Sequence, residues 1–89
     1  MSTVWLVPAG TDSADGASAG DYLLRPSGGG LYEVGAVDTS VQSCTWLGEL
    51  SGDLLPPLPQ VDGPQEAPEQ KKLLAAVQGV ESAQANRGG

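Results

Sequence analysis

The stretch Tyr22–Val37, YLLRPSGGGLYEVGAV, decides the fold, because it predicts two strands joined by a tight turn. Tyr22–Arg25 is apolar and aromatic-rich, as strands often are, and Pro26 is expected to end it. Ser27–Gly30 supplies glycines, which tolerate the positive φ angles that tight hairpin turns require. Leu31–Val37 then forms the returning strand. The sequence therefore predicts an antiparallel hairpin at the centre of the chain.

Two further strands are predicted on either side of this hairpin. Thr3–Val7 is β-branched and aromatic, and Pro8 ends it. Asp38–Ser40 forms a turn after the hairpin, and Val41–Leu50 supplies a fourth strand. The first strand has no polar face, so we expect both of its faces to be covered, by a helix or by a partner.

The composition changes after residue 50. Five of the seven prolines lie in residues 51–68, which favours an extended connector. A helix is then expected to begin at Pro68, since proline suits the first helical position. Its apolar stripe is narrow and Gly79 interrupts it, so we expect this helix to fray unless it is docked. The stripe consists of Leu73, Leu74, Val77 and Val80.

The fold class that follows is α+β. It comprises a small antiparallel sheet of three or four strands, either free-standing or part of a barrel shared with a partner, then a proline-rich connector and one C-terminal helix. The expected division is a β-rich domain at 1–50, a linker at 51–67 and a helix with a flexible end at 68–89.

The charge balance disfavours direct binding to nucleic acid or to an anionic membrane. The 89 residues carry 11 acidic and 4 basic side chains, a net charge of −7, whereas phosphate binding needs clustered lysine and arginine. The N-terminus has no basic region of the kind a signal peptide carries, and there is one cysteine. We therefore expect an intracellular location, cytoplasmic or nuclear.

Residue chemistry gives no candidate catalytic, cofactor-binding or metal-binding residue. Histidine is absent, so Cys44 has no histidine base to activate it as a nucleophile. Asp12, Asp15 and Asp21 do not have the spacing of a calcium loop. The glycine run at 28–30 lacks the lysine of a phosphate loop. We expect no cofactor and no enzymatic activity.

The leading hypothesis is a non-catalytic accessory or scaffolding subunit of an intracellular multiprotein complex. Its partner would be another protein chain, because the strands offer more apolar surface than so short a chain readily covers. We expect a hetero-complex rather than a homo-oligomer. The alternative is an acidic inhibitor or nucleic-acid mimic that blocks a basic protein surface. The residues predicted to bind the partner are Trp5, Leu6, Tyr32, Trp46, Leu73 and Val77.

Overall fold

A computed structural model of the chain describes residues 2–8, 16–39, 43–54 and 65–88. The elements are β1 (Val4–Leu6), β2 (Tyr22–Gly28), β3 (Leu31–Ala36), β4 (Thr45–Ser51), the short 3₁₀ helix η2 (Gly52–Leu54), β5 (Gln65–Glu66) and α1 (Gln70–Gly88). The predicted proline-rich connector falls largely on 55–64, outside the described residues, as do Asp12, Asp15 and the predicted strand start at Val41.

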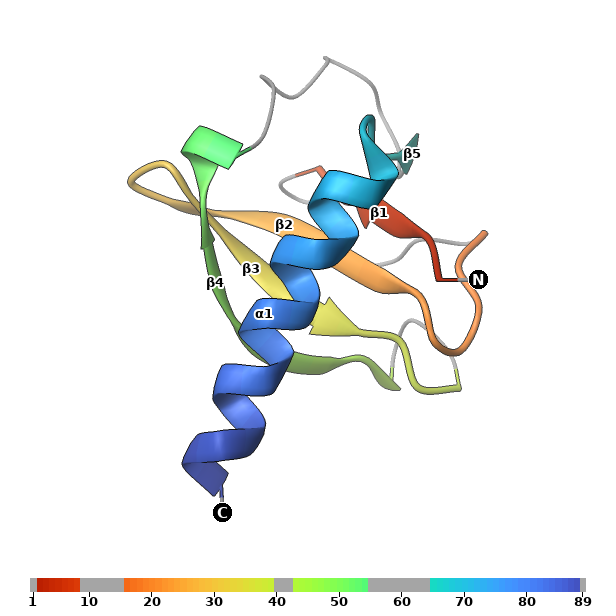
Figure 1. The fold of residues 1–89 in the computed structure, drawn as a ribbon. Helices are drawn as coiled ribbons and strands as arrows, with labels where there is room; N and C mark the ends of the chain where they lie inside the picture. The colour runs from red at the N-terminus through yellow and green to blue at the C-terminus, as the bar shows by residue number, and fades with distance from the viewer. Residues whose placement is uncertain (1, 9–15, 40–42, 55–64, 89) are drawn as a thin grey trace.

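The strands form one mixed sheet, in the order β4-β3-β2-β1-β5 across the described residues (Figure 1). The α+β class is confirmed, but the prediction of three or four antiparallel strands is wrong. β1 pairs with β2 in parallel, and β5 adds a fifth strand antiparallel to β1. Parallel pairing needs a crossover of about a dozen residues or more, and the connection between Leu6 and Tyr22 is long enough to supply it.

The central hairpin is confirmed, although its first strand is longer than predicted. Gly28 pairs with Leu31 across a two-residue turn in which Gly29 and Gly30 both have positive φ angles, of 59° and 80°. β2 continues past Pro26, which lies opposite Tyr32. Proline fits there because β1 pairs with β2 only as far as Leu24, so no second strand needs the missing N–H.

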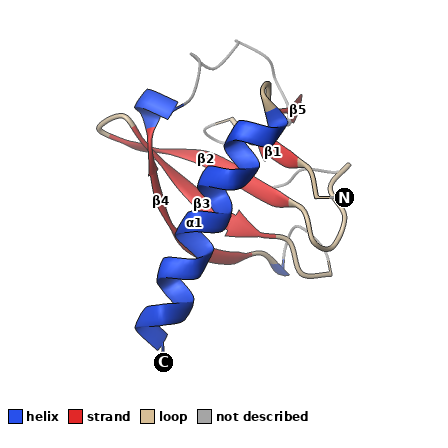
Figure 2. Cartoon of the chain, viewed as in Figure 1, coloured by secondary structure: helices blue, strands red, loops and turns tan. Residues whose placement is uncertain are grey.

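Helix α1 lies across one face of the sheet, which gives a two-layer molecule (Figure 2). Alternate strand residues point toward it, so that apolar side chains from the strands meet Leu73 and Val77 of the helix. The buried members of this core are Val4, Leu6, Tyr22, Leu24, Val34, Leu50, Ala67, Leu73 and Val77. One face of the first strand is therefore covered by the helix of the same chain.

The opposite face of the sheet carries a smaller apolar cluster. Val7, Leu23 and Val37 are buried there, and Trp5, Ala17 and Cys44 pack against them. Trp5 lies close to the backbone at Gly16, where an added Cβ would be 2.9 Å from Cη2 of the indole. The second face of the first strand is thus also partly covered within the chain.

The helix begins two residues later than predicted, at Gln70 rather than at Pro68. Glu69 adopts a left-handed conformation with φ of 52°, and its carbonyl accepts the first helical hydrogen bond from the N–H of Leu73. The Gln70 side chain then joins the helix to the sheet. Its Oε1 accepts the Val4 N–H at 2.7 Å, and its Nε2 donates to the carbonyls of Val4 and Ala67 at 2.8 and 2.6 Å. The helix start is fixed by this docking.

Candidate protein-binding surface at the β4 edge

Three large apolar side chains of β3, β4 and η2 are exposed. Among the described residues, Trp46 is 45% exposed and Leu31 and Leu54 are each 38% exposed. Trp46 lies in β4, Leu31 begins the neighbouring β3, and Leu54 ends η2 directly after β4. Leu31 lies opposite Ser51 at one end of the β3–β4 pair, whereas Trp46 lies opposite Gly35 near the other end, so the exposed groups are spread along this strand pair. Trp46 is the largest and most exposed of them.

Trp46 is held in place on the sheet face opposite α1. It pairs with Gly35 of β3, and an added Cβ at Gly35 would lie 2.8 Å from Cε3 of the indole and 2.6 Å from Sγ of Cys44. The Arg25 guanidinium lies 4.8 Å from the centre of the Trp46 ring, within cation–π range. The indole is therefore oriented by its neighbours while much of its surface stays exposed.

Two carboxylates, of Glu33 and Glu49, lie on the same sheet face as Trp46. Arg25 donates from Nη2 and Nε to Oε2 of Glu33, at 2.8 and 3.1 Å. Glu49 is the cross-strand neighbour of Glu33, and Glu49 accepts a hydrogen bond from the Ser27 hydroxyl at 3.3 Å. The two carboxylates, of Glu33 and Glu49, outnumber the single Arg25 guanidinium, so this face of the sheet carries excess negative charge near Trp46 at neutral pH.

β4 is an edge strand whose backbone has a sheet neighbour on one side among the described residues. Its pairing with β3 shifts register where Val34 lies opposite Gly48 and Gly35 opposite Trp46, which leaves Leu47 as the extra residue of a bulge. An edge strand presents N–H and C=O groups that another strand can bind. Within the described part of the chain, β3 is therefore the one strand paired with β4.

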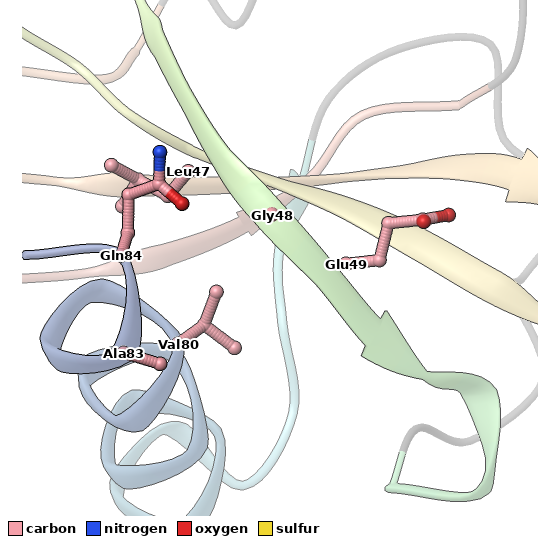
Figure 3. Close-up of a pocket in the computed structure, with 6 residues that line it drawn as sticks. All are labelled: Leu47, Gly48, Glu49, Val80, Ala83 and Gln84. Atoms are coloured by element: carbon pink, nitrogen blue, oxygen red, sulfur yellow. The ribbon is translucent and has the colours of Figure 1, made fainter. Parts of the chain in front are cut away.

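A pocket of about 180 Å³ lies between β4 and the C-terminal half of α1. Figure 3 shows its lining, with the Glu49 side chain directed away from the helix. The lining residues are Leu47, Gly48, Glu49, Val80, Ala83 and Gln84. An added Cβ at Gly48 would lie 3.0 Å from Cγ1 of Val80, so glycine is what lets strand and helix approach here. The two sides of β4 differ: the α1 side has this mainly apolar pocket, and the other has Trp46 and Glu49.

A second hollow, of about 440 Å³, lies on the other side of the molecule, where β5 and the N-terminal half of α1 meet the start of the chain. It is lined by Ser2, Thr3, Glu66, Gln70, Lys71, Leu74 and Gln78. Gln70 is occupied there with bonds to Val4 and Ala67, so its amide holds the fold together. The exposed aromatic and the long edge strand belong to the β4 side, which is why we place the candidate site there.

Burial, hydrogen bonds and nearby charges within the chain explain the pKa shifts of the described groups. Burial alone would raise the pKa of Asp21, but hydrogen bonds from the N–H groups of Ser18 and Thr3 and from the Trp5 indole hold it below its usual value. Burial raises the pKa of the Cys44 thiol, against a smaller opposing effect of the Arg25 charge. At neutral pH Cys44 is therefore a protonated thiol, a poor nucleophile.

Tyr22 is the third such group. Burial raises its pKa, and its hydroxyl donates to Oε1 of Glu81 at 2.9 Å, which raises it further. This bond links β2 to α1. The shifted groups are thus explained by packing and hydrogen bonding within the chain.

The six residues predicted to bind a partner lie in different surroundings. Three of them, Leu6, Leu73 and Val77, are buried in the core between the sheet and the helix and belong to the same apolar cluster. Tyr32 is half-buried against the same core. Their positions in the folded chain do not test whether these residues bind a partner, so that role stays a prediction.

The two tryptophans differ from each other. Trp5 is half-buried, and its indole Nε1 donates to Oδ2 of Asp21 at 3.1 Å. Trp46 is the predicted residue that is exposed on the edge strand β4. Sequence reasoning missed Glu49, Val80 and Ala83, which line the pocket between β4 and α1. The signal available was Gly48, because glycine within a strand pattern indicates a bulge or a close backbone approach.

Comparisons with models of protein families, with curated proteins and with solved structures gave no match to this chain. Within the described residues, no group of three or more histidine, cysteine or carboxylate side chains is arranged to hold a metal ion. The helices of that part of the chain also lack a segment with the length and hydropathy needed to span a membrane.

Proposed function

We propose that this chain is a non-catalytic accessory subunit that binds another protein along the β4 edge, with Trp46 at the centre of the contact. The observation that carries the proposal is the combination of a strand that lies at the sheet edge, among the described residues, with a 45% exposed indole held by its neighbours. Edge strands bind extended segments through backbone hydrogen bonds, and tryptophan is enriched among residues that contribute most to interface energy. The partner is a different protein, in an intracellular assembly.

The ionisable groups favour binding over catalysis. The groups with shifted pKa values, Asp21, Tyr22 and Cys44, act as packing or hydrogen-bonding residues, and none of them lines either hollow described above. The free Cys44 thiol also agrees with a reducing intracellular compartment.

The nucleic-acid-mimic hypothesis has less support. A mimic needs carboxylates displayed together on one surface, whereas several acidic side chains here are engaged elsewhere. Asp21 is buried under three hydrogen bonds, Glu33 forms an ion pair with Arg25, and Glu81 accepts from Tyr22.

Site-specific photo-crosslinking in the native host cell tests the proposal. Benzoylphenylalanine at position 46 is expected to give a discrete cross-linked product with another protein. The matched control carries the same group at position 66, an exposed residue of the opposite sheet edge, and should give none. Equal products from both positions, or no product from position 46, would contradict the proposed surface.

A further inference from the structure

We infer that the occupant of the β4 edge is an extended segment in which basic and small apolar residues alternate. This inference rests on the proposed function and specifies the chemistry of the partner. Because successive side chains of a strand point to opposite faces, a segment added to β4 must meet two different environments in turn. On one side it meets the pocket beneath α1, and on the other it meets Trp46 and Glu49.

The side toward α1 selects a small apolar side chain. The pocket of about 180 Å³ has Leu47, Gly48, Val80 and Ala83 in its lining, together with Glu49 and Gln84. In Figure 3 the helix residues Val80 and Ala83 face β4 across this pocket. A valine or leucine side chain buried there would lose its contact with water and gain dispersion contacts on both walls.

The opposite side selects cations. Trp46 and Glu49 both lie on the face away from α1, separated in the strand by the bulge and by Gly48. Glu49 and Glu33 outnumber the Arg25 guanidinium, so a lysine or arginine of the partner gains an ion pair there. A second cation can lie over the exposed surface of the Trp46 ring.

A second copy of this chain is a poor occupant of the same edge. Each copy carries a net charge of −7, so two copies repel. The strand that would pair in a symmetric dimer, Thr45–Ser51, has the sequence TWLGELS and contains no lysine or arginine to meet Glu49. Charge complementarity therefore favours a basic segment from another protein.

Titration of the full-length chain with synthetic peptides, followed through its backbone amide NMR signals, tests the inference. The probe is the capped peptide Lys-Val-Lys-Val-Lys-Val-Lys. It is compared with the glutamine and glutamate analogues at the lysine positions, and with a peptide of the same composition in which lysines and valines form two blocks. We expect shifts in the amides of β4 with the alternating lysine peptide, about tenfold weaker binding of the glutamine peptide, and no binding of the glutamate peptide.

Variants of the chain locate the two contacts. Glu49→Lys is expected to weaken binding of the lysine peptide about tenfold, whereas Glu66→Lys, which makes the same charge change on the opposite edge, leaves it unchanged. Ala83→Leu fills the pocket from an exposed helical position and should weaken binding about tenfold. Ala75→Leu, also exposed on α1 and absent from the pocket lining, is the matched control.

The outcomes separate this inference from the proposed function. Equal binding of the lysine, glutamine and glutamate peptides at β4 would overturn the charge selection while leaving edge docking in place. Equal binding of the block peptide would overturn the alternation. Absence of β4 shifts with every peptide, together with a cross-link at position 46, would overturn the extended basic occupant but retain the surface. Absence of both would remove the surface itself.

Discussion

At the scale of single residues, Asp21 is the buried carboxylate that ties the start of the chain to the sheet. It accepts hydrogen bonds from Thr3, Trp5 and Ser18, at 3.1, 3.1 and 2.9 Å. An asparagine in its place could not accept all three, because its NH₂ group would face a donor. We expect Asp21→Asn to lower the free energy of unfolding at pH 7 by about 1–3 kcal/mol, measured by urea denaturation.

The pH dependence of this effect has a defined sign. Because the pKa of Asp21 is lowered in the folded chain, the unfolded chain binds its proton more tightly. Its stabilising contribution is therefore fully present above the unfolded pKa of about 3.9 and is lost as the pH falls through the lower, folded value. The difference in the free energy of unfolding between wild type and Asp21→Asn should therefore become smaller as the pH is lowered from 5 to 2. A difference that stays constant over this range would contradict the assigned role.

Gly35 is the residue on which the placement of Trp46 depends. An added Cβ would lie 2.6 Å from Sγ of Cys44 and 2.8 Å from Cε3 of Trp46, both side chains packed against the sheet. We expect Gly35→Ala to cost about 1–3 kcal/mol of stability, as overpacking does, and to change the near-ultraviolet circular dichroism of the tryptophans. The double variant Gly35→Ala, Cys44→Ala should recover part of the loss.

Gly79→Ala is the matched control for that substitution. Apart from the adjacent residues and the backbone of α1 itself, no described heavy atom lies within 4 Å of a Cβ built at Gly79, and the residue is exposed. Alanine there should raise the free energy of unfolding by about 0.5–1 kcal/mol, because glycine is a poor helix former. If both substitutions destabilise equally, packing around Trp46 is not what makes Gly35 necessary.

At the scale of elements, Gln70 joins α1 to β1 by imitating a peptide group. Its amide accepts from the N–H of Val4 and donates to the carbonyls of Val4 and Ala67, where a longer β5 would otherwise pair. The two properties of the side chain that matter are therefore one acceptor and one NH₂ donor.

Gln70→Glu distinguishes the contribution of these hydrogen bonds to stability from the contribution of helix propensity. A glutamate in the first turn suits the helix dipole, so the isolated helix should be slightly favoured by the change. In the folded chain, however, the carboxylate has no hydrogen to donate to the two carbonyls. We expect a net loss of about 2–3 kcal/mol in the free energy of unfolding and faster hydrogen exchange at the amide of Val4. A neutral or stabilising effect would contradict the bridging role.

Local signals explain which elements could be predicted from the sequence. The hairpin was predictable because Gly29 and Gly30 meet the φ requirement of a two-residue turn, and the helix because Leu73 and Val77 repeat at helical spacing. β5 was not predictable, since Gln65–Glu66 is too short to show a period. The parallel pairing of β1 depends on long-range contacts, for which only the length of the crossover gave a hint.

The candidate site was predictable in part for the same reason. Trp46 is identifiable from residue type alone, because large exposed aromatics are common at interfaces. The pocket is not, since Val80 and Ala83 come beside Gly48 only through the packing of α1 on β4. Leu6, by contrast, has the same apolar character as an interface residue but is covered by the helix.

At the scale of the whole molecule, one core joins the β-rich segment at 1–50 to the helical segment at 68–89. Leu73 and Val77 of α1 are fully buried in the same cluster as Val4 and Leu24 of the sheet. Most of the stability of a helix in a protein comes from the packing of its apolar face, and Gly79 lowers the helix propensity of α1 further, so α1 depends on this docking. The two segments should therefore unfold together.

We expect the far-ultraviolet signal of the helix and the near-ultraviolet signal of the tryptophans to give coincident thermal transitions. Val77→Ala should lower the midpoint temperatures of both transitions by the same amount, because it lowers the free energy of unfolding by about 2 kcal/mol. For a domain of this size that corresponds to a fall in Tm of roughly 10 °C. Gln78→Ala, at the adjacent exposed position, is the control and should leave Tm nearly unchanged. A far-ultraviolet transition at clearly lower temperature than the tryptophan signal would mean that the helix melts alone. The pocket beside β4 would then be lost before the sheet unfolds.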